Sequence, residues 1–420
     1  MTPRPLSFAA ALLSGLWWSV AAYAEETNTL PTWAQLMQEM APIGDVGANK
    51  LADPEDPQAR QDLLRWQHEM ISQAFFALQY QDPKYPDFWP MFNQVYPYAF
   101  ANPDDSYYQA VVEDTGVYRI SGVRGTTRIV DFEIGSGLFI PYGKGSLAPT
   151  LAHYDLDTVK IGKDGRFEVV LSPARPKDWK GDWWQLDSGA TFIWVRQRAY
   201  DWKNEVDGRF AIERLDVPAA RPRKSATEVA EGLRQLPKWA ANWEQFRQTW
   251  TKRLYDRGLV NKVAPLDLSS TGGIKTQSYL QGMFDVQADE ALILETEIPA
   301  QCRYWSFHLA DENTDTLDWM NRQTQLNGLT ARRDADGKLR IVIAAKDPGV
   351  PNWLDVVERR HGMIVGRWLS CSSYPQPQVT KVKFTDVRKN LPADTPSVTP
   401  AAREAAIRAK REAAQLRRRW

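Results

Sequence analysis

The chain has 420 residues, which is enough for two domains of ordinary size, and its 43% apolar and 25% charged residues are typical of a folded globular protein. Its formal net charge is zero, but residues 401–420 hold seven basic and two acidic side chains, which leaves 44 basic and 50 acidic side chains in residues 25–400. This balance of −6 over the body of the chain argues against nucleic acid as a partner.

Residues 1–24 have the composition of a secretion signal. Arg4 is followed by the apolar run FAAALLSGLWWSVAA, and Ala22-Tyr23-Ala24 is a small-x-small cleavage pattern before Glu25. The apolar run is short for a bilayer span. We therefore expect a cleaved signal peptide rather than an uncleaved anchor, and a periplasmic or secreted mature protein.

Residues 25–115 are predicted to form an N-terminal helix followed by an aromatic, proline-rich segment. Within residues 56–81, Leu64, Ile71, Phe75 and Leu78 recur at helical spacing. The following stretch, PDFWPMFNQVYPYAFANPDDSYYQAVVE, is too rich in prolines for a long helix. Its turn ANPDDSYY is either a plain loop or a place to hold a hydroxylated ligand or a cation.

Residues 116–220 alternate apolar and polar side chains in short runs and are predicted to form a first β-sandwich. The sequence KDGR is typical of a two-residue hairpin turn. In KGDWWQLD only one of Trp183 and Trp184 can face the core, and we expect the other at a domain interface. In HYDLD, His153 and two aspartates share a strand face, which is a weak metal pattern and is common in a solvated strand.

Residues 221–262 are predicted to be a helical linker, interrupted at Pro237, and residues 263–390 a second β-sandwich. Residues 391–420 are expected to form a linker and a basic C-terminal helix. Such a helix either contacts an anionic membrane surface or a partner, or is solvated.

The two strand-rich halves share a pattern. Asp164-Gly165-Arg166-Phe167 is followed by a proline-containing link, Trp184 and Arg196, and Asp336-Gly337-Lys338-Leu339 by a similar link, Trp353 and Arg367. The pattern indicates an internal repeat, with chance similarity of hairpins as the alternative. We predict a mainly β fold of two tandem jelly-roll-like antiparallel sandwiches, with an N-terminal helix and a helical linking segment.

The only cysteines, Cys302 and Cys371, both lie in predicted strands of the second half. In an oxidising compartment they either form one disulfide or remain two buried thiols, because sequence spacing does not give their geometry.

Four stretches of the second half resemble one bacterial family. They are GMFDVQADEALILETEIP, RYWSFHLADENTDTLDWMNRQTQLNG, DGKLRIVIAAKDPGVPNWLD and GMIVGRWL. Together they resemble the C-terminal module of proteins catalogued as the domain of unknown function 1214 family, and DPGVPNWLD is the most specific block. The upstream FANPDDSYYQAVVEDTGVYRISGVRG is distantly similar to the companion domain numbered 1254. The resemblance implies jelly-roll sandwiches similar to viral capsid folds, and it brings no catalytic residues because the family has no agreed reaction.

The block from Asp347 to Asp355 holds the main candidate residues. Two prolines fix its backbone, and a fixed loop can present Asn352 and Trp353 to a ligand. Asp347 or Asp355 is the candidate general acid or base if the protein is a hydrolase. The alternative is structural: Pro-Gly forms a turn, Trp353 fills the end of the sandwich, and Asp355 caps a short helix.

The strand patterns also contain four arginines, Arg303, Arg322, Arg340 and Arg367. Half of the side chains of a strand face inward, and an inward arginine needs a carboxylate or an anionic ligand. Asp347 and Asp355 are candidate partners in structural ion pairs. The alternative is a pocket for an anion or a carbohydrate, and the four arginines are therefore candidate ligand-binding residues.

Apart from the weak pattern at HYDLD, metal and cofactor chemistry have no support in the sequence. The four histidines, His68, His153, His308 and His361, have no paired spacing, and no phosphate loop, dinucleotide fingerprint or Gly-x-Ser-x-Gly elbow occurs in a credible context. We predict no metal and no cofactor.

The functional prediction rests on the compartment, the predicted fold and the 18 tryptophans, whose flat rings can stack on sugars, sterols and similar ligands. We expect an exported protein that binds or acts on a carbohydrate-like or other hydroxylated small molecule at the end of a sandwich. The alternative is a non-catalytic structural protein of the cell envelope that forms homo-oligomers.

Overall fold

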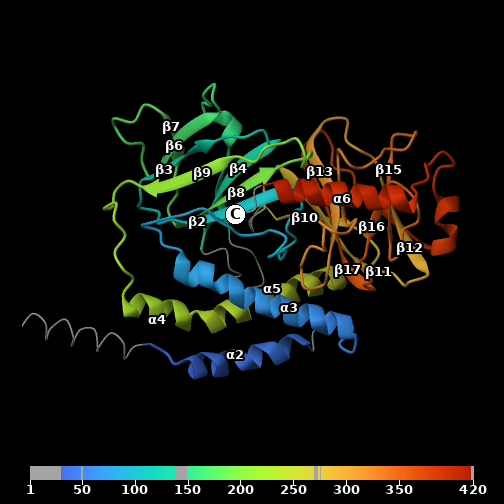
Figure 1. The fold of residues 1–420 in the computed structure, drawn as a ribbon, viewed down its shortest axis with the longest axis horizontal. Coiled ribbons are helices and arrows are strands. Elements are labelled where there is room, and N and C mark those ends of the chain that lie inside the picture. Colours follow the sequence, from blue (N-terminus) through green and yellow to red (C-terminus); the bar gives the residue numbers. More distant parts are fainter. Residues whose placement is uncertain (1–29, 49–50, 138–148, 269–272, 275, 418–420) are drawn as a thin grey trace, which may run out of the picture.

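The computed structural model describes residues 30–48, 51–137, 149–268, 273–274 and 276–417. Two β-sandwiches lie side by side above a layer of helices (Figure 1). The prediction of a mainly β protein with two tandem sandwiches is confirmed. The predicted signal peptide lies outside the described residues. In the part of the chain that the structure describes, no helix has the length and apolar character needed to cross a membrane.

The first sandwich has two sheets with the strand orders β1-β2-β8-β4-β5 and β7-β6-β3-β9. Its strands are β1 (Trp89–Pro90), β2 (Asp105–Val111), β3 (Tyr118–Val123), β4 (Ile129–Ser136), β5 (Thr150–Asp155), β6 (Arg166–Ser172), β7 (Asp182–Gln185), β8 (Ala190–Arg198) and β9 (Arg209–Arg214). In β6, Phe167, Val169 and Leu171 enter the core between the sheets while Arg166 and Glu168 are exposed, as a period of two requires. Since β1 and β2 belong to this sandwich, it begins before residue 116.

The second sandwich repeats this arrangement with the strand orders β10-β11-β17-β13-β14 and β16-β15-β12-β18. Its strands are β10 (Ala264–Leu266), β11 (Gln277–Asp285), β12 (Glu290–Thr296), β13 (Cys302–Ala310), β14 (Gln325–Asn327), β15 (Leu339–Ala344), β16 (Trp353–Asp355), β17 (His361–Cys371) and β18 (Gln378–Lys383). Each strand of the first sandwich has the same place as the strand nine positions later in the second. The internal repeat is therefore real at the level of topology.

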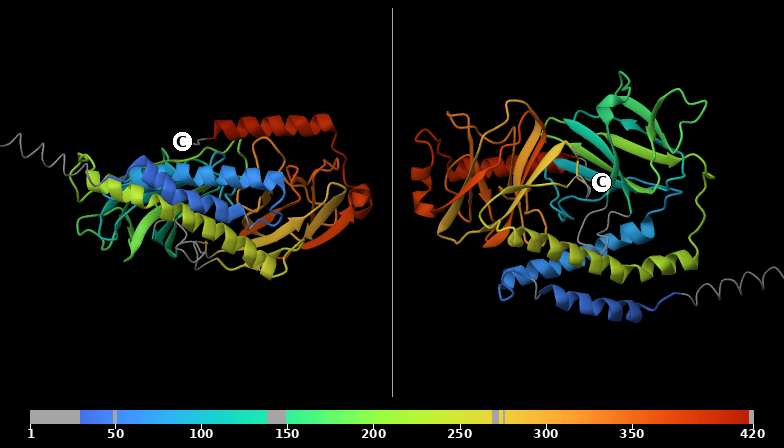
Figure 2. Two further views of the ribbon diagram at one scale, coloured as in Figure 1. Left: turned by 90° about the horizontal axis from the view of Figure 1, so that it is seen from below. Right: turned by 180° about the vertical axis from the view of Figure 1, so that it is seen from behind.

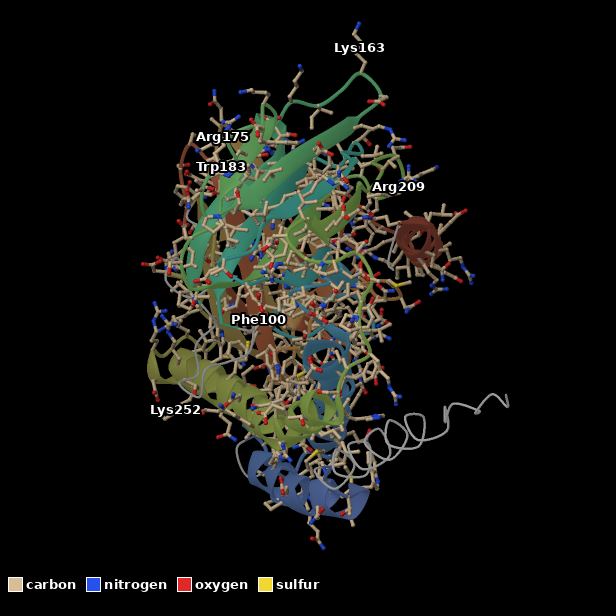
Figure 3. All side chains as sticks on the ribbon, turned by 90° about the vertical axis from the view of Figure 1, so that its left-hand side faces the viewer. Phe100, Lys163, Arg175, Trp183, Arg209 and Lys252 are labelled. Carbon is tan, nitrogen blue, oxygen red and sulfur yellow. A yellow bond between two sulfur atoms is a disulfide. The ribbon has the colours of Figure 1, made fainter. Side chains whose placement is uncertain are left out.

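The strand pairing shifts the equivalence of the two tryptophans by one residue, because the sequence pattern had matched Trp184 with Trp353. Val170 of β6 pairs with Trp183, and Val342 of β15, the equivalent position, pairs with Trp353. Trp353 thus corresponds to Trp183, whereas Trp184 lies in the core of the first sandwich. Trp183 donates its indole N–H to Ser172 and lies half-buried on the outer part of that sandwich, as Figure 3 shows.

Both short strands of the repeat, β7 and β16, run parallel to the strand they follow. The remaining pairs are antiparallel, so each four-stranded sheet is mixed rather than purely antiparallel. The proline-containing links at residues 173–181 and 345–352 make this possible, because they carry the chain back along the preceding strand. The link 345–352 contains the whole DPGVPN block.

The helical layer consists of α2 (Trp33–Ala48), α3 (Pro57–Phe75), which continues as a π-helical turn (Phe76–Tyr80), α4 (Ala226–Arg234) and α5 (Leu236–Asp256). Figure 2 shows α5 running beneath both sandwiches. Trp66 of α3 and Trp243 of α5 share one core with Trp194 of β8 and with Met283 and Val365 of the second sandwich. The helices therefore join the outer faces of both five-stranded sheets.

The predicted helix over residues 56–81 is present, but its buried face differs from the apolar spacing noted in the sequence. Asp56 caps α3 by accepting a hydrogen bond from the Gln58 N–H, and Pro57 stands in its first turn. Leu63, Trp66 and Met70 are buried. Leu64 and Phe75 are 66% and 59% exposed.

The C-terminal helix α6 (Pro400–Leu416) lies across both sandwiches (Figure 1). Ala413 and Ala414 pack with Trp202 of the first sandwich and Trp319 of the second. Within the second sandwich, Cys302 and Cys371 are register partners on β13 and β17 and form a disulfide. Of the two alternatives for the cysteines, the structure has the disulfide.

Candidate functional site

The link between β15 and β16, which contains the DPGVPN block, is held firmly by its surroundings. Gly349 has a φ of +67°, a left-handed conformation that favours glycine, and its N–H donates to Asp347 Oδ1 over 2.8 Å. The Gly349 carbonyl accepts from the Val398 N–H at 2.8 Å and from Arg388 at 2.6 Å. The link is a rigid corner.

Arg403 of α6 binds this corner at several points. Its Nε lies 2.9 Å from Asp347 Oδ2, and its other nitrogens donate to the carbonyls of Val350 and Pro351. Its guanidinium carbon also lies 5.3 Å from the centroid of the Trp353 ring, a cation–π contact. Arg403 of the basic helix therefore makes its contacts within the same chain.

Asn352 crosslinks two neighbouring segments. Its side-chain nitrogen donates to the carbonyls of Arg332 and Arg340 over 2.6 and 2.9 Å, and its oxygen accepts from the Arg332 N–H at 2.8 Å. The side chain is 6% exposed. All three of these side-chain hydrogen bonds are thus made to backbone groups of the second sandwich.

An open cleft of about 570 Å³ lies between α6 and this corner, and we call it the α6 cleft. Four of the predicted site residues line it: Asp347, Trp353, Asp355 and Arg322. The other lining residues with charged or amide side chains are Asn321, Arg403, Glu404, Arg408 and Arg411. Four of the residues predicted from the sequence therefore lie in one cleft. The cleft itself forms only because the fold places α6 beside β16.

Ion pairs neutralise most charges of the α6 cleft. Arg322 Nε lies 2.7 Å from Asp355 Oδ2, and Arg408 pairs with Glu404. Arg411 has no ion pair among the described residues, and its Nε is buried without a hydrogen-bond partner. Arg411 is thus the arginine of this cleft that has no ion pair with the described residues.

The other predicted arginines lie elsewhere. Arg340 pairs with Glu295, Asp334 and Asp336 at distances of 2.7–2.8 Å. These contacts place it on the four-stranded sheet, and it lines a small pocket with Asn352 of about 10 Å³.

Arg303 and Arg367 lie at the junctions between parts of the molecule. Arg303 reaches across to the first sandwich, where it pairs with Asp155 and, over 3.1 Å, with Asp157. Arg367 contacts His308 Nδ1 at 3.1 Å and donates to the Phe100 carbonyl at 2.7 Å. Burial lowers the pKa of His308 well below its usual value. Both arginines therefore hold the fold together.

The HYDLD motif contains Asp155 and Asp157, the two partners of Arg303 at the junction between the sandwiches. His153 Nε2 lies 3.3 Å from the buried Asp131, and this contact raises the pKa of His153 against the effect of burial. Within the described ranges, no group of three His, Cys, Asp or Glu side chains is arranged to hold a metal ion.

A second hollow was missed by the sequence analysis. We call it the acid pocket; its volume is about 400 Å³, and it lies between α3 and the segment that joins β13 to β14. Its charged lining residues are Asp62, Arg65, Asp311, Asp315, Asp318 and Arg359. Desolvation by burial raises the pKa of Asp311 to about 6 and the pKa of Asp315 well above its usual value. The signal was present in the sequence as DENTDTLD, a run of acids directly after a buried strand.

The protein thus consists of two β-sandwiches, and the α6 cleft and the acid pocket both lie beside the second one. Residues 284–371 match the model of a family described as "Protein of unknown function (DUF1214)". The match runs from β11 to β17, so that the second sandwich carries this module, as the resemblance implied. No curated protein matches the chain.

The solved structures to which the chain is similar include two bacterial proteins. An uncharacterized protein from Burkholderia cenocepacia superposes with a TM-score of 0.78 at 26% identity, over 84% of this chain and 97% of that one. The VPA0106 protein from Vibrio parahaemolyticus gives a TM-score of 0.44 at 13% identity, over 81% and 100% of the two chains. The first of these supports the two-sandwich fold across most of the chain.

Proposed function

We propose that this protein is exported and binds a carbohydrate-like or other hydroxylated ligand in the α6 cleft. The observation that carries the proposal is the cleft itself. Its volume of about 570 Å³ lies within the ~300–1,000 Å³ usual for small-molecule sites. It combines an aromatic ring, Trp353, with several polar side chains, as such sites commonly do.

The polar groups suggest how a hydroxylated ligand would be held. Asp347 and Asp355 offer carboxylate oxygens to ligand hydroxyl groups, and Asn321 offers an amide. The unpaired guanidinium of Arg411 would suit an acidic substituent, such as the carboxylate of a uronic acid. Because Arg403 covers the face of Trp353, the ligand would meet the indole at its edge.

Binding is favoured over hydrolysis at these two aspartates. A general acid or base has to reach an atom of the substrate directly, whereas an ion pair directs the carboxyl oxygens to an arginine of the protein. Asp347 pairs with Arg403 at 2.9 Å, and Asp355 pairs with Arg322 at 2.7 Å. We therefore assign both carboxylates to ligand binding and to the support of the corner.

Export is proposed from the N-terminal sequence, and the disulfide supports it because disulfides persist mainly in oxidising compartments. The upstream similarity to the companion domain numbered 1254 is part of the same proposal, and it would make the first sandwich a module of its own. The alternative function is a structural protein that forms oligomers in the envelope.

A thermal-shift screen of the purified protein against neutral sugars, uronic acids, sterols and aromatic acids, with sizing chromatography, tests the proposal. A hydroxylated ligand should raise the melting temperature, and Arg411→Gln should weaken the binding of an acidic sugar by about tenfold. Arg333→Gln, which removes the same charge from an exposed position of the second sandwich, is the control. A protein that responds to no ligand and elutes as a large oligomer would favour the structural alternative.

A further inference from the structure

The acid pocket contains buried carboxyl groups that form no ion pair with the described residues. Asp311 and Asp315 are 5% and 6% exposed, and both line the pocket. Glu69 of α3 is 7% exposed and lies close enough for its charge to raise the pKa of Asp315. In the described part of the chain, no lysine or arginine lies at ion-pair distance from any of the three.

The oxygens of this group are incompletely hydrogen-bonded. Asp311 Oδ1 accepts from the backbone N–H groups of Asn313 and Asp315, over 2.8 and 2.9 Å. Asp315 Oδ1 and Glu69 Oε1 are buried and have no hydrogen-bond partner, and the same is true of both amide atoms of Asn313. A buried polar group without a partner is costly, which makes a bound ligand a physical explanation for this arrangement.

The neighbouring charges leave the pocket negative. Arg359 is paired with Asp62 at 2.7 Å, and Arg65 is exposed at the rim. The carboxyl groups facing the pocket or close behind it are Asp62, Glu69, Asp311, Glu312, Asp315 and Asp318, and the positive groups are Arg65 and Arg359. Burial raises the pKa of Glu69 well above its usual value.

The backbone around the pocket is fixed in unusual conformations. Five non-glycine residues with positive φ lie in the segments that form or support it, Ala99, Phe100, Thr314, Val357 and Glu358. The Phe100 N–H donates to the Thr314 carbonyl at 2.9 Å, and Thr316 donates to the Ala101 carbonyl at 2.7 Å. The acidic turn is therefore held by hydrogen bonds against the segment before β2.

We propose that the acid pocket binds an organic ammonium ion, such as a primary amine or a diamine, through Asp311 and Asp315. An ammonium group brings three donors for the unpartnered oxygens and one positive charge for the buried carboxylates. Trp319, which lines the same pocket, offers its ring to the carbon chain of the ligand. This site is separate from the ligand-binding function proposed for the α6 cleft.

Other ligand classes fit the acid pocket less well. An anion would meet like charges at every buried acid. A metal ion needs convergent ligands, and no such group was found among the described residues. A neutral sugar would satisfy hydrogen bonds but would leave the carboxyl groups without a counter-charge.

Calorimetric titration of the full chain with 1,4-diaminobutane tests the proposal, with 1,4-butanediol and succinate as neutral and anionic comparators. We expect heat only from the diamine, with release of protons as the carboxyl groups ionise. Since the pKa of Asp311 is about 6, affinity should fall about tenfold between pH 7.5 and pH 5. The absence of diamine binding, or equal binding of butanediol, would overturn the proposal.

Variants locate the site. Asp315→Asn keeps the shape of the side chain and should weaken diamine binding at least tenfold, while sugar binding in the α6 cleft is unchanged. Glu412→Gln removes an exposed carboxylate of α6 and is the matched control. Glu69→Gln is the second variant if Asp315→Asn does not fold. Wild-type affinity in the folded variants would show that the diamine binds elsewhere and would refute this assignment.

Discussion

The guanidinium of Arg417 forms a two-point ion pair with Asp207, with Nη2 2.9 Å from Oδ1 and Nε 3.2 Å from Oδ2. Arg417 follows the last turn of α6, whereas Asp207 lies before β9 of the first sandwich. At the other end of the same helix, Arg403 holds the corner of the second sandwich. The basic helix thus ties one sandwich to the other, and the prediction that it contacts a membrane surface or a partner remains a prediction.

Replacement of Arg417 should destabilise the protein. The side chains of Arg417 and Asp207 are 7% and 1% exposed, so Arg417→Ala leaves a buried carboxylate without its partner. We expect a loss of about 3 kcal/mol in the free energy of unfolding. Urea denaturation measures it. Arg408→Ala, which breaks an exposed pair with Glu404 on the same helix, should change stability by less than about 0.5 kcal/mol.

Asn352→Ala separates a structural role from a ligand-binding role. The variant leaves the Arg332 N–H and two carbonyl groups without their partner, which should cost about 2 kcal/mol of unfolding free energy. Because its hydrogen bonds are directed to the backbone, affinity for a ligand of the α6 cleft should be unchanged. A large loss of affinity in a variant of normal stability would instead place Asn352 in the binding site.

The disulfide should contribute measurably to stability. Cys302 and Cys371 are 69 residues apart in sequence, and closing a loop of this length is worth about 4 kcal/mol in the chain-entropy description. Reductant should therefore lower the melting temperature of the wild-type protein. The double variant Cys302→Ser with Cys371→Ser should have the lower melting temperature from the start and should not respond to reductant.

Asp104 should make stability depend on pH. It is fully buried between the sandwiches and accepts hydrogen bonds from Tyr304, Trp202, Gln325 and Asn327. Burial outweighs these donors and raises its pKa from 3.8 to about 6. Between these two values the unfolded chain has released the proton that the native protein still holds. The contribution of Asp104 to stability therefore falls as pH rises from about 4 to about 6, by about 3 kcal/mol.

The variant Asp104→Asn isolates this contribution. The difference in unfolding free energy, wild type minus variant, should decrease by about 3 kcal/mol between pH 4 and pH 7 and be constant above that range. Chemical denaturation across this pH range measures the difference. A difference that does not vary with pH would show that the native pKa of Asp104 is not raised.

The sequence determined the local structure and the repeat. Alternating side chains predicted the strands, and the Asp-Gly pairs at Gly165 and Gly337 predicted turns, in which both glycines have a positive φ, 78° and 82°. The hairpin expected at KDGR is not formed, because β6, which follows this turn, pairs with β3 and β7 and not with β5. The block DPGVPNWLD marked the module that the family model matches. These features depend on neighbouring residues, so the order of residues is sufficient to specify them.

Only the tertiary structure decided which residues share a site. Asp347 and Trp353 share a cleft with Arg411 because α6 returns across the second sandwich, and Arg303 meets Asp155 because the sandwiches lie side by side. Glu69 and Asp315 come together from α3 and from the segment after β13. Leu64 is exposed although it fits a helical apolar spacing, because the sheets cover the other side of α3. Contacts of this kind arise from packing between distant segments, and the spacing of residues along the chain carries no record of them.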